Sequence, residues 1–477
     1  MTSVSIFPVL LMPAVFMLSQ FGLHIPNPAL EDPAADEARF NTVNGHLDMG
    51  GTVYAYISVD GDLTAIGNYL EGKLNEIRRL DQRAKVPPVD IPQLLQISGL
   101  DAVDAVGISS KRIAGGDGFR NKAYILAPNA RQGLLRLLGE EPKPFDVVKL
   151  APVGTDVAIE QEVNLKVCYE VALEVVGMLQ GDEGRAKLEA KAKRPAGPFP
   201  FTLEKILADL DTQVTLVLDA DPSWKIQIPG VKGAEIPQVN FAAMIDGLGW
   251  VVEEIAATIE KEFQGKEGRG KPPVAIIRGG DWSGLQLEIP QGQRIPTWAA
   301  LLTTIGDSKP VFLHHKPSGK LVLASGKEFA TKLFQEKPGL ATDPTFQKTM
   351  EGLPTKGTGL SYVSPELFKI MRAAFANLPA PEEWGKGKDM FVAKTLLDLV
   401  FPEGLRGEGR VTTSTKEGIL TVSNSSTSHK GKLASPMLMG SLPAVLFGLK
   451  GKAQRTPYPG SEVPSEHVHE SEGKTER

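Results

Sequence analysis

The chain has 477 residues, more than one ordinary hydrophobic core accommodates, so two domains or one duplicated domain are expected. Hydrophobic residues make up 42% and charged residues 23%, a globular balance, and the formal net charge is -5. This charge gives no overall basic surface for a phosphate backbone, which argues against nucleic acid as a partner. The single cysteine, Cys168, excludes an intramolecular disulfide and a zinc site built from several cysteines.

The N-terminal residues predict export. Val4–Leu23 contains no charged residue, and an apolar run in this place is typical of a signal peptide or membrane anchor, so residues 1–23 are assigned as leader or anchor. No Lys or Arg precedes the run, and Pro8 and Pro13 disfavour a straight helix, so the alternative is a segment docked on the folded body. Residues 24–45, rich in Pro, Ala and acidic residues, are predicted to be a spacer.

A recurring unit organises the remaining chain: a Gly-Thr step, an alternating run typical of a strand, and a run with helical spacing. The copies are Leu150–Val176, Leu353–Phe375 and, more loosely, Met49–Leu70. The short helix and strand that follow the first copy, from Thr202, recur after the second copy, from Thr395. This shared order favours duplication.

The predicted fold class is therefore α+β, with two related (duplicated) halves, each a mostly antiparallel sheet flanked by helices. The first repeat is assigned to residues 46–239 and the second to residues 240–432. The apolar segment 433–449 is too short and too broken by proline for a confident membrane span, and we expect it to dock on the body, with membrane contact as the alternative. Residues 450–477, rich in Pro, Ser, Glu and His, are predicted to be disordered.

In the first repeat, a turn at Asp219–Ser223 is expected to separate two paired strands, and Gly181–Pro200 is expected to be an exposed connection. The predicted strands are Thr52–Val59, Val103–Ser109, Lys122–Ala127, Gln213–Leu218 and Trp224–Ile228. The predicted helices are Leu63–Leu80, Gln132–Leu138 and Thr202–Leu210.

In the second repeat, Phe241–Phe263 has the broadest apolar stripe of the sequence and predicts a single long helix packed in the core. Further helices are predicted at Trp298–Ile305 and Lys327–Gln335. The predicted strands are Val274–Ile277, Gly284–Ile289, Pro310–His315, Lys320–Ser325, Gly409–Thr415 and Gly418–Ser423.

The motifs that usually mark chemistry are incomplete. Gly265–Pro272 has the lysine of a phosphate-binding loop but Pro272 where Ser or Thr would hold magnesium. Gly280–Gly284 lacks the glycine that a nucleophile elbow needs two residues before the serine. His314 and His315, adjacent on a strand, point to opposite faces and cannot chelate one ion together. Cys168 is read as a buried small hydrophobe. No residue is assigned a catalytic, cofactor-binding or metal-binding role, and no cofactor is predicted.

The segment Lys320–Ile370 resembles a family of exported bacterial proteins that share a domain of unknown function. The features that carry the resemblance are the strand Leu321–Ser325, the Asp-Pro-x-Phe helix at Asp343–Phe346 and the Tyr-Val pair at Tyr362-Val363. Ser435–Gly448 is similar to the small-residue apolar segment at the end of some members. The resemblance implies an N-terminal leader and a duplicated α+β fold, and it implies no catalytic residues.

These observations favour a non-enzymatic exported protein of the cell envelope with a binding or structural role. Two alternatives stay open: a carrier of a hydrophobic ligand or lipid, and a hydrolase whose site converges from loops. The partner would be an envelope protein or a hydrophobic ligand, with membrane contact through the N-terminal segment. The expected location is the periplasm or the cell envelope.

Overall fold

Most predicted strands join one large antiparallel sheet. The computed structural model describes residues 33–59, 61–80, 89–116, 118–128, 132–139, 141–197, 199–208, 211–227, 235–263, 274–288, 309–335, 338–376 and 404–430. The strands of the large sheet are β1 (Val53–Ser58), β2 (Ala105–Arg112), β3 (Phe119–Leu126), β5 (Val157–Asn164), β6 (Asp211–Gln227), β7 (Glu235–Ile245), β8 (Val274–Gly279), β9 (Trp282–Leu287), β10 (Val311–His315), β11 (Lys320–Ala324), β13 (Gly359–Val363), β14 (Glu408–Ser414) and β15 (Gly418–Ser425). A separate pair joins β4 (Lys143–Pro144) to β12 (Lys356–Gly357).

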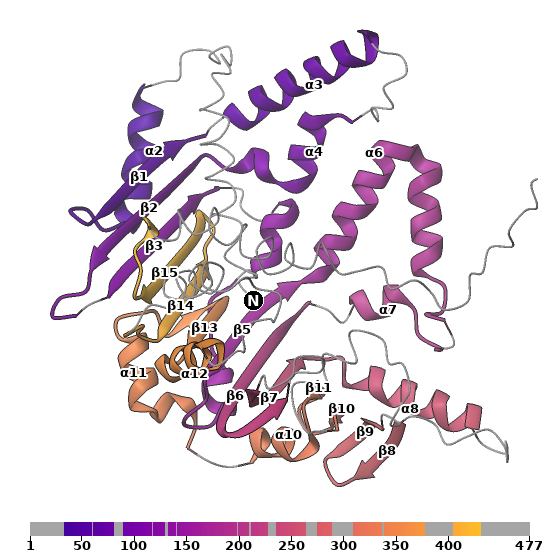
Figure 1. Ribbon diagram of the computed structural model, residues 1–477. Coiled ribbons are helices and arrows are strands. Elements are labelled where there is room, and N and C mark those ends of the chain that lie inside the picture. The colour runs from indigo at the N-terminus through magenta and orange to yellow at the C-terminus, as the bar shows by residue number, and fades with distance from the viewer. Residues whose placement is uncertain are drawn as a thin grey trace, which may run out of the picture. The chain divides into compact units, whose positions relative to one another are not determined.

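The 13 strands of the large sheet pair in the order β1-β2-β3-β15-β14-β13-β5-β6-β7-β11-β10-β9-β8, and every neighbouring pair is antiparallel (Figure 1). The α-helices are α2 (Pro33–His46), α3 (Asp62–Leu80), α4 (Ile91–Ser98), α5 (Val147–Leu150), α6 (Leu165–Ala192), α7 (Leu203–Ala208), α8 (Gly249–Phe263), α10 (Lys327–Phe334), α11 (Pro344–Met350) and α12 (Pro365–Ala376). Three 3-10 helices are η1 (Leu100–Ala102), η2 (Gly133–Leu138) and η3 (Leu340–Thr342). The α+β class is confirmed.

Each Gly-Thr step leads into a strand and then a helix, as predicted. The step at Gly154 precedes β5 and α6, that at Gly357 precedes β13 and α12, and that at Gly51 precedes β1 and α3. The strands β5 and β13 pair with each other near the middle of the sheet, where Ile159 lies opposite Ser361. The recurring unit therefore builds the centre of the sheet twice.

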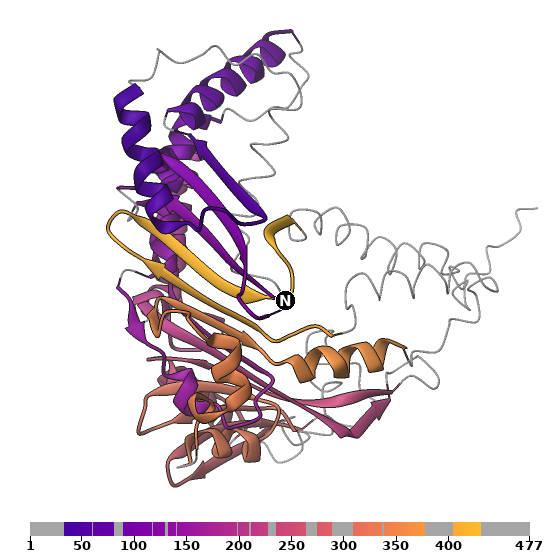
Figure 2. The same cartoon turned by 90° about the vertical axis from the view of Figure 1, so that its left-hand side faces the viewer.

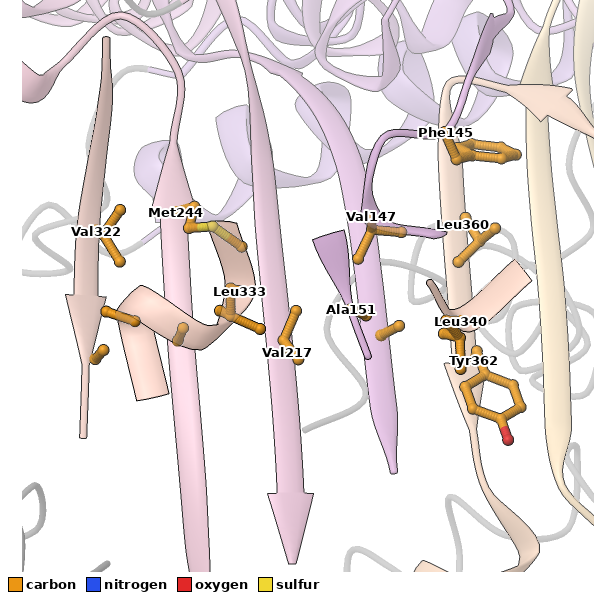
Figure 3. Close-up of a cluster of buried hydrophobic side chains, with 14 of the residues drawn as sticks. Phe145, Val147, Ala151, Val217, Met244, Val322, Leu333, Leu340, Leu360 and Tyr362 are labelled. Carbon is orange, nitrogen blue, oxygen red and sulfur yellow. The ribbon is translucent and has the colours of Figure 1, made fainter. Parts of the chain in front are cut away.

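The largest core lies on one face of the central strands. Its members are buried apolar residues from the strands and from α5, α10, η3 and α11, and Figure 3 shows many of them. Leu333 of α10 lies beside Met244 of β7, and Leu340 of η3 lies beside Tyr362 of β13 (Figure 3). Phe346 of α11 meets the Tyr362 ring edge-on, with the ring centroids 5.0 Å apart. These short helices cover the sheet because each presents one apolar side to it.

Part of the expected spacer is a helix. Residues 33–46 form α2, which packs on the sheet with Val43 fully buried and Leu47 nearly so. The close fit depends on Gly107 of β2, because a Cβ at this position would come within 2.4 Å of the Val43 side chain. The composition suggested a spacer, but Val43 and Leu47 share one helical face, and burial of that face stabilises the helix.

The predicted long helix Phe241–Phe263 is wrong in its first part. Residues up to Ile245 belong to β7, and α8 begins at Gly249, after a break at Gly247 with a φ of 74°. Strand β7 pairs with β6 and β11 along its two edges, and its apolar residues 241–245 are buried or half-buried on both faces. A strand buried on both faces has a continuous apolar run, which periodicity alone does not distinguish from a buried helix.

Two further boundaries differ from the prediction for related reasons. The predicted turn at Asp219–Ser223 is a shift of register within one long strand, β6, which pairs with β7 instead of folding back on itself. The predicted connection after Gly181 is helical as far as Ala192, and Gly181, with φ 69°, marks the bend of α6 that Figure 1 shows. In both places the regular backbone is interrupted where the sequence indicated, but the same strand or helix continues after the interruption.

The two predicted repeats do not form separate sheets. Strands from the two residue ranges alternate in blocks, because β15, β14 and β13 lie between β3 and β5. The predicted boundary between residues 239 and 240 falls inside β7. All the described residues belong to one compact unit. Several predicted segments lie outside the described residues: the leader 1–23, residues 24–32, the helix Trp298–Ile305, the apolar segment 433–449 and the tail 450–477.

Among the described helices, none combines the length and the apolar composition that a membrane span requires.

Candidate functional site

A groove of about 1430 Å³ lies on the sheet. Its floor is formed by β3 and β15, and its ends are formed by Asp48, just after α2, and by α11 with the turn that follows it. Figures 1 and 2 both show β15, in yellow, between α2 and α11. The groove lies between α2, whose Val43 packs with Tyr124 and Leu126 of β3, and α11.

Basic side chains outnumber acidic ones in the lining of this groove, which we call the basic groove. Among the described residues, six cations and two carboxylates line it: Lys111, Arg112, Arg120, Lys122, Lys348 and Arg406 against Asp48 and Glu351. This excess of positive charge occurs in a chain whose net charge is -5. A concave surface lined by one sign of charge concentrates its field and attracts the opposite charge. The groove is therefore suited to an anionic ligand.

The β2–β3 hairpin places two of these cations directly opposite each other. Lys111 pairs with Arg120 in the register of the two strands, so both side chains project from the same face. Like charges in directly opposed positions destabilise a sheet, by up to roughly 1 kcal/mol. Because Lys111 is exposed, its side chain gains little from packing that could offset this repulsion. An anion bound between the two side chains would remove the repulsion.

Arg120 also ties the groove to the C-terminal end of α11. Its guanidinium donates to the backbone carbonyl of Glu351 at 2.7 Å and to Asn424 Oδ1 at 3.3 Å. The amide of Asn424 donates to the carbonyls of Thr349 and Glu351. Carbonyls at a helix C-terminus lack partners within the helix, so this network satisfies them and fixes one wall of the groove. Gly352, at φ 70°, leaves room for the guanidinium, which lies 2.5 Å from where a Cβ would be.

The remaining cations differ in how they are held. Lys122 Nζ forms an ion pair with Asp48 at 2.8 Å, and the Arg112 guanidinium lies over the Phe119 ring, 5.1 Å from its centroid. Within the described residues, no carboxylate lies at ion-pair distance from Lys111 or Lys348, and both are exposed. A ligand can therefore pair with these two lysines without first displacing a carboxylate.

The basic groove is equipped for binding more than for chemistry. The described residues of its lining include no histidine and no cysteine, the side chains that most often act as base or nucleophile. Thr345, Thr349 and Ser425 supply hydroxyls, and Ser425 already donates to the Thr427 carbonyl at 2.7 Å. The arrangement can fix anionic groups by charge and hydrogen bonds.

A second cavity, of about 490 Å³, lies among α4, η2 and α6. Its lining is also polar, with four charged or amide side chains on α4 and η2 and two glutamates on α6. Within it, Arg136 forms an ion pair with Glu170 at 3.0 Å. It lacks the excess of one charge that marks the basic groove.

The carboxylates with displaced pKa values lie outside both cavities. Burial raises the pKa of Glu160 to about 7, although the amides of Val147 and Asp146 donate to it and act in the opposite direction. Glu160 is 1% exposed and also accepts a hydrogen bond from the Gln213 amide. Its position on β5 lets it cap the N-terminus of α5, which is a structural role.

A second buried acidic group joins the Gly-Thr units. Asp156 accepts hydrogen bonds from the Ser364 hydroxyl and, at 2.9 Å, from the Ala220 amide. Burial is the main cause that raises the pKa of the nearby Asp219, and burial likewise raises the pKa of Tyr362. Ser364 in turn caps α12 by accepting from the Leu367 amide. These contacts hold β5, β6 and α12 together.

The histidines behave as predicted for adjacent strand residues. His314 Nδ1 lies 2.8 Å from Glu253 of α8, and the His315 ring packs 4.0 Å from the Phe334 ring of α10. The helices α8 and α10 therefore cover opposite faces of β10. Ser283 donates to the same Glu253 oxygen at 2.9 Å. The carboxylate, not the imidazole, is the shared partner, so the group lacks the order of a catalytic triad.

Cys168 is exposed on α6, so its interpretation as a buried small hydrophobe is wrong. It lies beside Val167, which faces the core and is buried, while Cys168 falls on the outer side of the helix. Partial burial raises the pKa of its thiol, which disfavours the reactive thiolate.

No residue of the basic groove was given a binding role from the sequence alone. The sequence does contain one signal, a group of basic residues on the two sides of the β2–β3 turn. Lys111 and Arg112 precede the turn, and Arg120 and Lys122 follow it. Residues two apart share a strand face, so Arg120 and Lys122 could have been placed together. The contributions of Lys348 and Arg406 come from distant segments and could not.

The fold and the groove define an α+β protein with one open antiparallel sheet and a basic cleft on one face. Comparison of the chain with protein-family models, with curated proteins and with solved structures gives no match. The resemblance of Lys320–Ile370 to a family of exported proteins therefore stays a hypothesis.

Proposed function

We propose that the protein is a non-enzymatic binding protein of the cell envelope and that the basic groove binds an anionic partner. The observation that carries this proposal is the lining of the groove, six cations against two carboxylates, in a chain with an excess of acidic residues. The cost of opposing Lys111 to Arg120 supports it, since a bound anion would convert repulsion into attraction. The location rests on the uncharged N-terminal run Val4–Leu23.

We also propose that the chain is a duplicated unit whose two copies are interleaved in one sheet. Outward from the central pair, the order β13-β14-β15-β3-β2 matches the order β5-β6-β7-β11-β10. The helices α12 and α6 follow β13 and β5 directly. A two-fold rotation through the central pair would exchange the two series. This arrangement explains why the two residue ranges contribute alternate blocks of strands.

The two other functions have less support from the described residues. A carrier of a hydrophobic ligand predicts a cavity lined by apolar residues, whereas both cavities described have several charged side chains in their linings. A hydrolase predicts displaced pKa values within a cleft, whereas Glu160 and Asp219 lie outside both cavities. Neither alternative is favoured by a specific observation.

The binding proposal is tested by titrating the full chain with poly-L-glutamate and with sodium polyphosphate in an isothermal calorimeter. We expect at least one of them to bind, with an affinity that falls as salt rises because the attraction is electrostatic. The double variant Lys111→Glu, Lys348→Glu should lose binding without loss of fold, since both lysines are exposed. The double control Lys166→Glu, Lys191→Glu makes the same charge change at two exposed sites on α6 and should bind normally.

Binding of neither polyanion, or equal binding by the double variant, would overturn the assignment of the groove. Export is tested separately by intact mass measurement on protein from the envelope fraction of a bacterial host. A mass that is short by the leader is expected, and a full-length chain confined to the cytosol would contradict export.

A further inference from the structure

The place of the basic groove on β3 and β15 corresponds to the place of α10 on β11 and β7. In the sheet order, β3 neighbours β15 as β11 neighbours β7 on the other side of the central pair. The two places also share one face of the sheet. This follows from the register, in which directly paired residues run across the sheet: Val322, Met244, Thr215, Glu160, Leu360, Val411, Val422 and Lys122.

The register makes the correspondence residue by residue. Val322 of β11 lies opposite both Leu313 and Met244. The Leu313–Val322 pair is the third from the turn of the β10–β11 hairpin. Arg120 of β3 lies opposite both Lys111 and Asn424. The Lys111–Arg120 pair is also the third from the turn of its hairpin, if the residues joined by the Ile113–Gly118 hydrogen bond are counted as the first pair. The row Leu313, Val322, Met244 thus matches the row Lys111, Arg120, Asn424.

The two rows differ in what covers them. Leu313, Val322 and Met244 are fully buried, and α10 packs on them through Phe329, Ala330 and Leu333. In the first copy the helix that follows β3 is η2, which packs on the opposite face, where Leu135 lies in a core with Ile125. The basic groove is therefore the place that a covering helix fills in one copy and leaves open in the other.

We propose that the basic groove is the docking site for an acidic amphipathic helix from a partner protein. This inference rests on the proposed function and specifies its ligand. The size agrees: a helix about 10 Å across and three turns long occupies roughly 1300 Å³, and the groove has about 1430 Å³. Small-molecule pockets are smaller, at about 300–1000 Å³.

The lining fits both sides of such a helix. Leu420 of β15, Ile113 and Leu405, each partly exposed, provide an apolar floor, and the buried Val422 and Leu353 beneath it belong to the main core. Lys111 and Lys348, both exposed, stand on opposite walls, on β2 and on α11. A helix with leucines on one side and glutamates on its flanks would cover the floor and pair with both lysines. An inorganic polyanion would pair with the lysines and leave the apolar floor exposed.

The test uses fluorescein-labelled peptides of about three helical turns and fluorescence anisotropy on the full chain. The probe peptide carries Leu and Glu at helical spacing. One matched peptide replaces each Leu by Ser, which keeps the charge, and another replaces each Glu by Lys, which keeps the apolar side. Sodium polyphosphate is the competitor. We expect the Leu-Glu peptide to bind roughly tenfold or more tightly than either matched peptide and to gain helicity in circular dichroism on binding.

The Lys111→Glu and Lys348→Glu variants should each weaken this binding by roughly tenfold, and Lys166→Glu should not change it. The helix proposal would be overturned if the peptide with Ser in place of Leu bound as tightly as the Leu-Glu peptide, or if polyphosphate displaced the two peptides equally. Either result would leave anion binding by the groove intact. Binding of the Leu-Lys peptide as tightly as the Leu-Glu peptide would overturn both, as would a failure of every anion to bind.

Discussion

Glu160 makes the stability of this protein depend on pH in the direction opposite to that of most carboxylates. Its side chain is 1% exposed in the middle of the sheet, and burial raises its pKa from 4.5 to about 7. Between these two values the unfolded chain has released the proton and the folded chain retains it. Folding therefore becomes less favourable as the pH rises through this window, and no further change follows above it.

The size of the effect follows from the shift. One pKa unit corresponds to 1.36 kcal/mol, so ionisation of Glu160 lowers the free energy of unfolding by about 3 kcal/mol in total. Between pH 5 and pH 8 the expected part of this loss is roughly 2–3 kcal/mol. The variant Glu160→Gln carries no proton to lose and should not show this loss. Gln also retains an oxygen that can accept from one of the two amides at the start of α5.

The assay is equilibrium unfolding in urea at pH 5 and at pH 8, followed by tryptophan fluorescence, on wild type and Glu160→Gln. Glu366→Gln is the control, because that carboxylate is exposed on α12 and paired with Lys369 at the surface. We expect the difference in unfolding free energy between wild type and Glu160→Gln to change by roughly 2–3 kcal/mol in favour of the variant at pH 8. A difference that is the same at both pH values would refute the reasoning, since it would mean that Glu160 does not ionise in this window.

Three further substitutions test the packing of α10 on the sheet and the structure of the groove wall at α11. Leu333→Ala removes a side chain that is 1% exposed beneath α10 and should lower the free energy of unfolding by about 2–5 kcal/mol, measured in urea. Asp343→Ala removes the N-cap of α11 and the hydrogen bond from the Gly154 amide, and should cost about 1–2 kcal/mol; a melting temperature equal to wild type would contradict this. Gly352→Ala forces a Cβ into the Arg120 guanidinium at a positive φ and should cost about 1–3 kcal/mol; the double variant with Arg120→Ala should recover only the part due to the clash.

Local sequence patterns predicted elements whose partners are close along the chain. The strands of the hairpins β2–β3, β10–β11 and β14–β15 were predicted because each is an alternating run bounded by a short turn. The helices α3 and α10 were predicted because each presents one apolar side. In these elements the spacing of the apolar residues indicates that one side is buried, and the structure buries that one side.

Local patterns failed where tertiary structure buried an element differently. Strand β7 was predicted as helix because both of its faces are apolar, and only its place between β6 and β11 makes it a strand. Helix α2 was predicted as spacer because its buried side is reduced to Val43 and its near neighbours, while its other residues are polar or small. Gly107 of β2 makes the room for it, and the sequence of α2 contains no information on that glycine.

The sequence by itself determined the α+β class, the recurrence of the Gly-Thr unit and the near absence of motifs for chemistry, because each of these is a property of residues close together in the chain. Tertiary structure alone decided the order of the strands and the basic groove. Lys111 and Lys348 lie far apart in the sequence and come together only because β15 and β14 insert between β3 and β13. Pairings between distant strands depend on which faces remain to be buried after the local elements have formed, and no single segment encodes that balance.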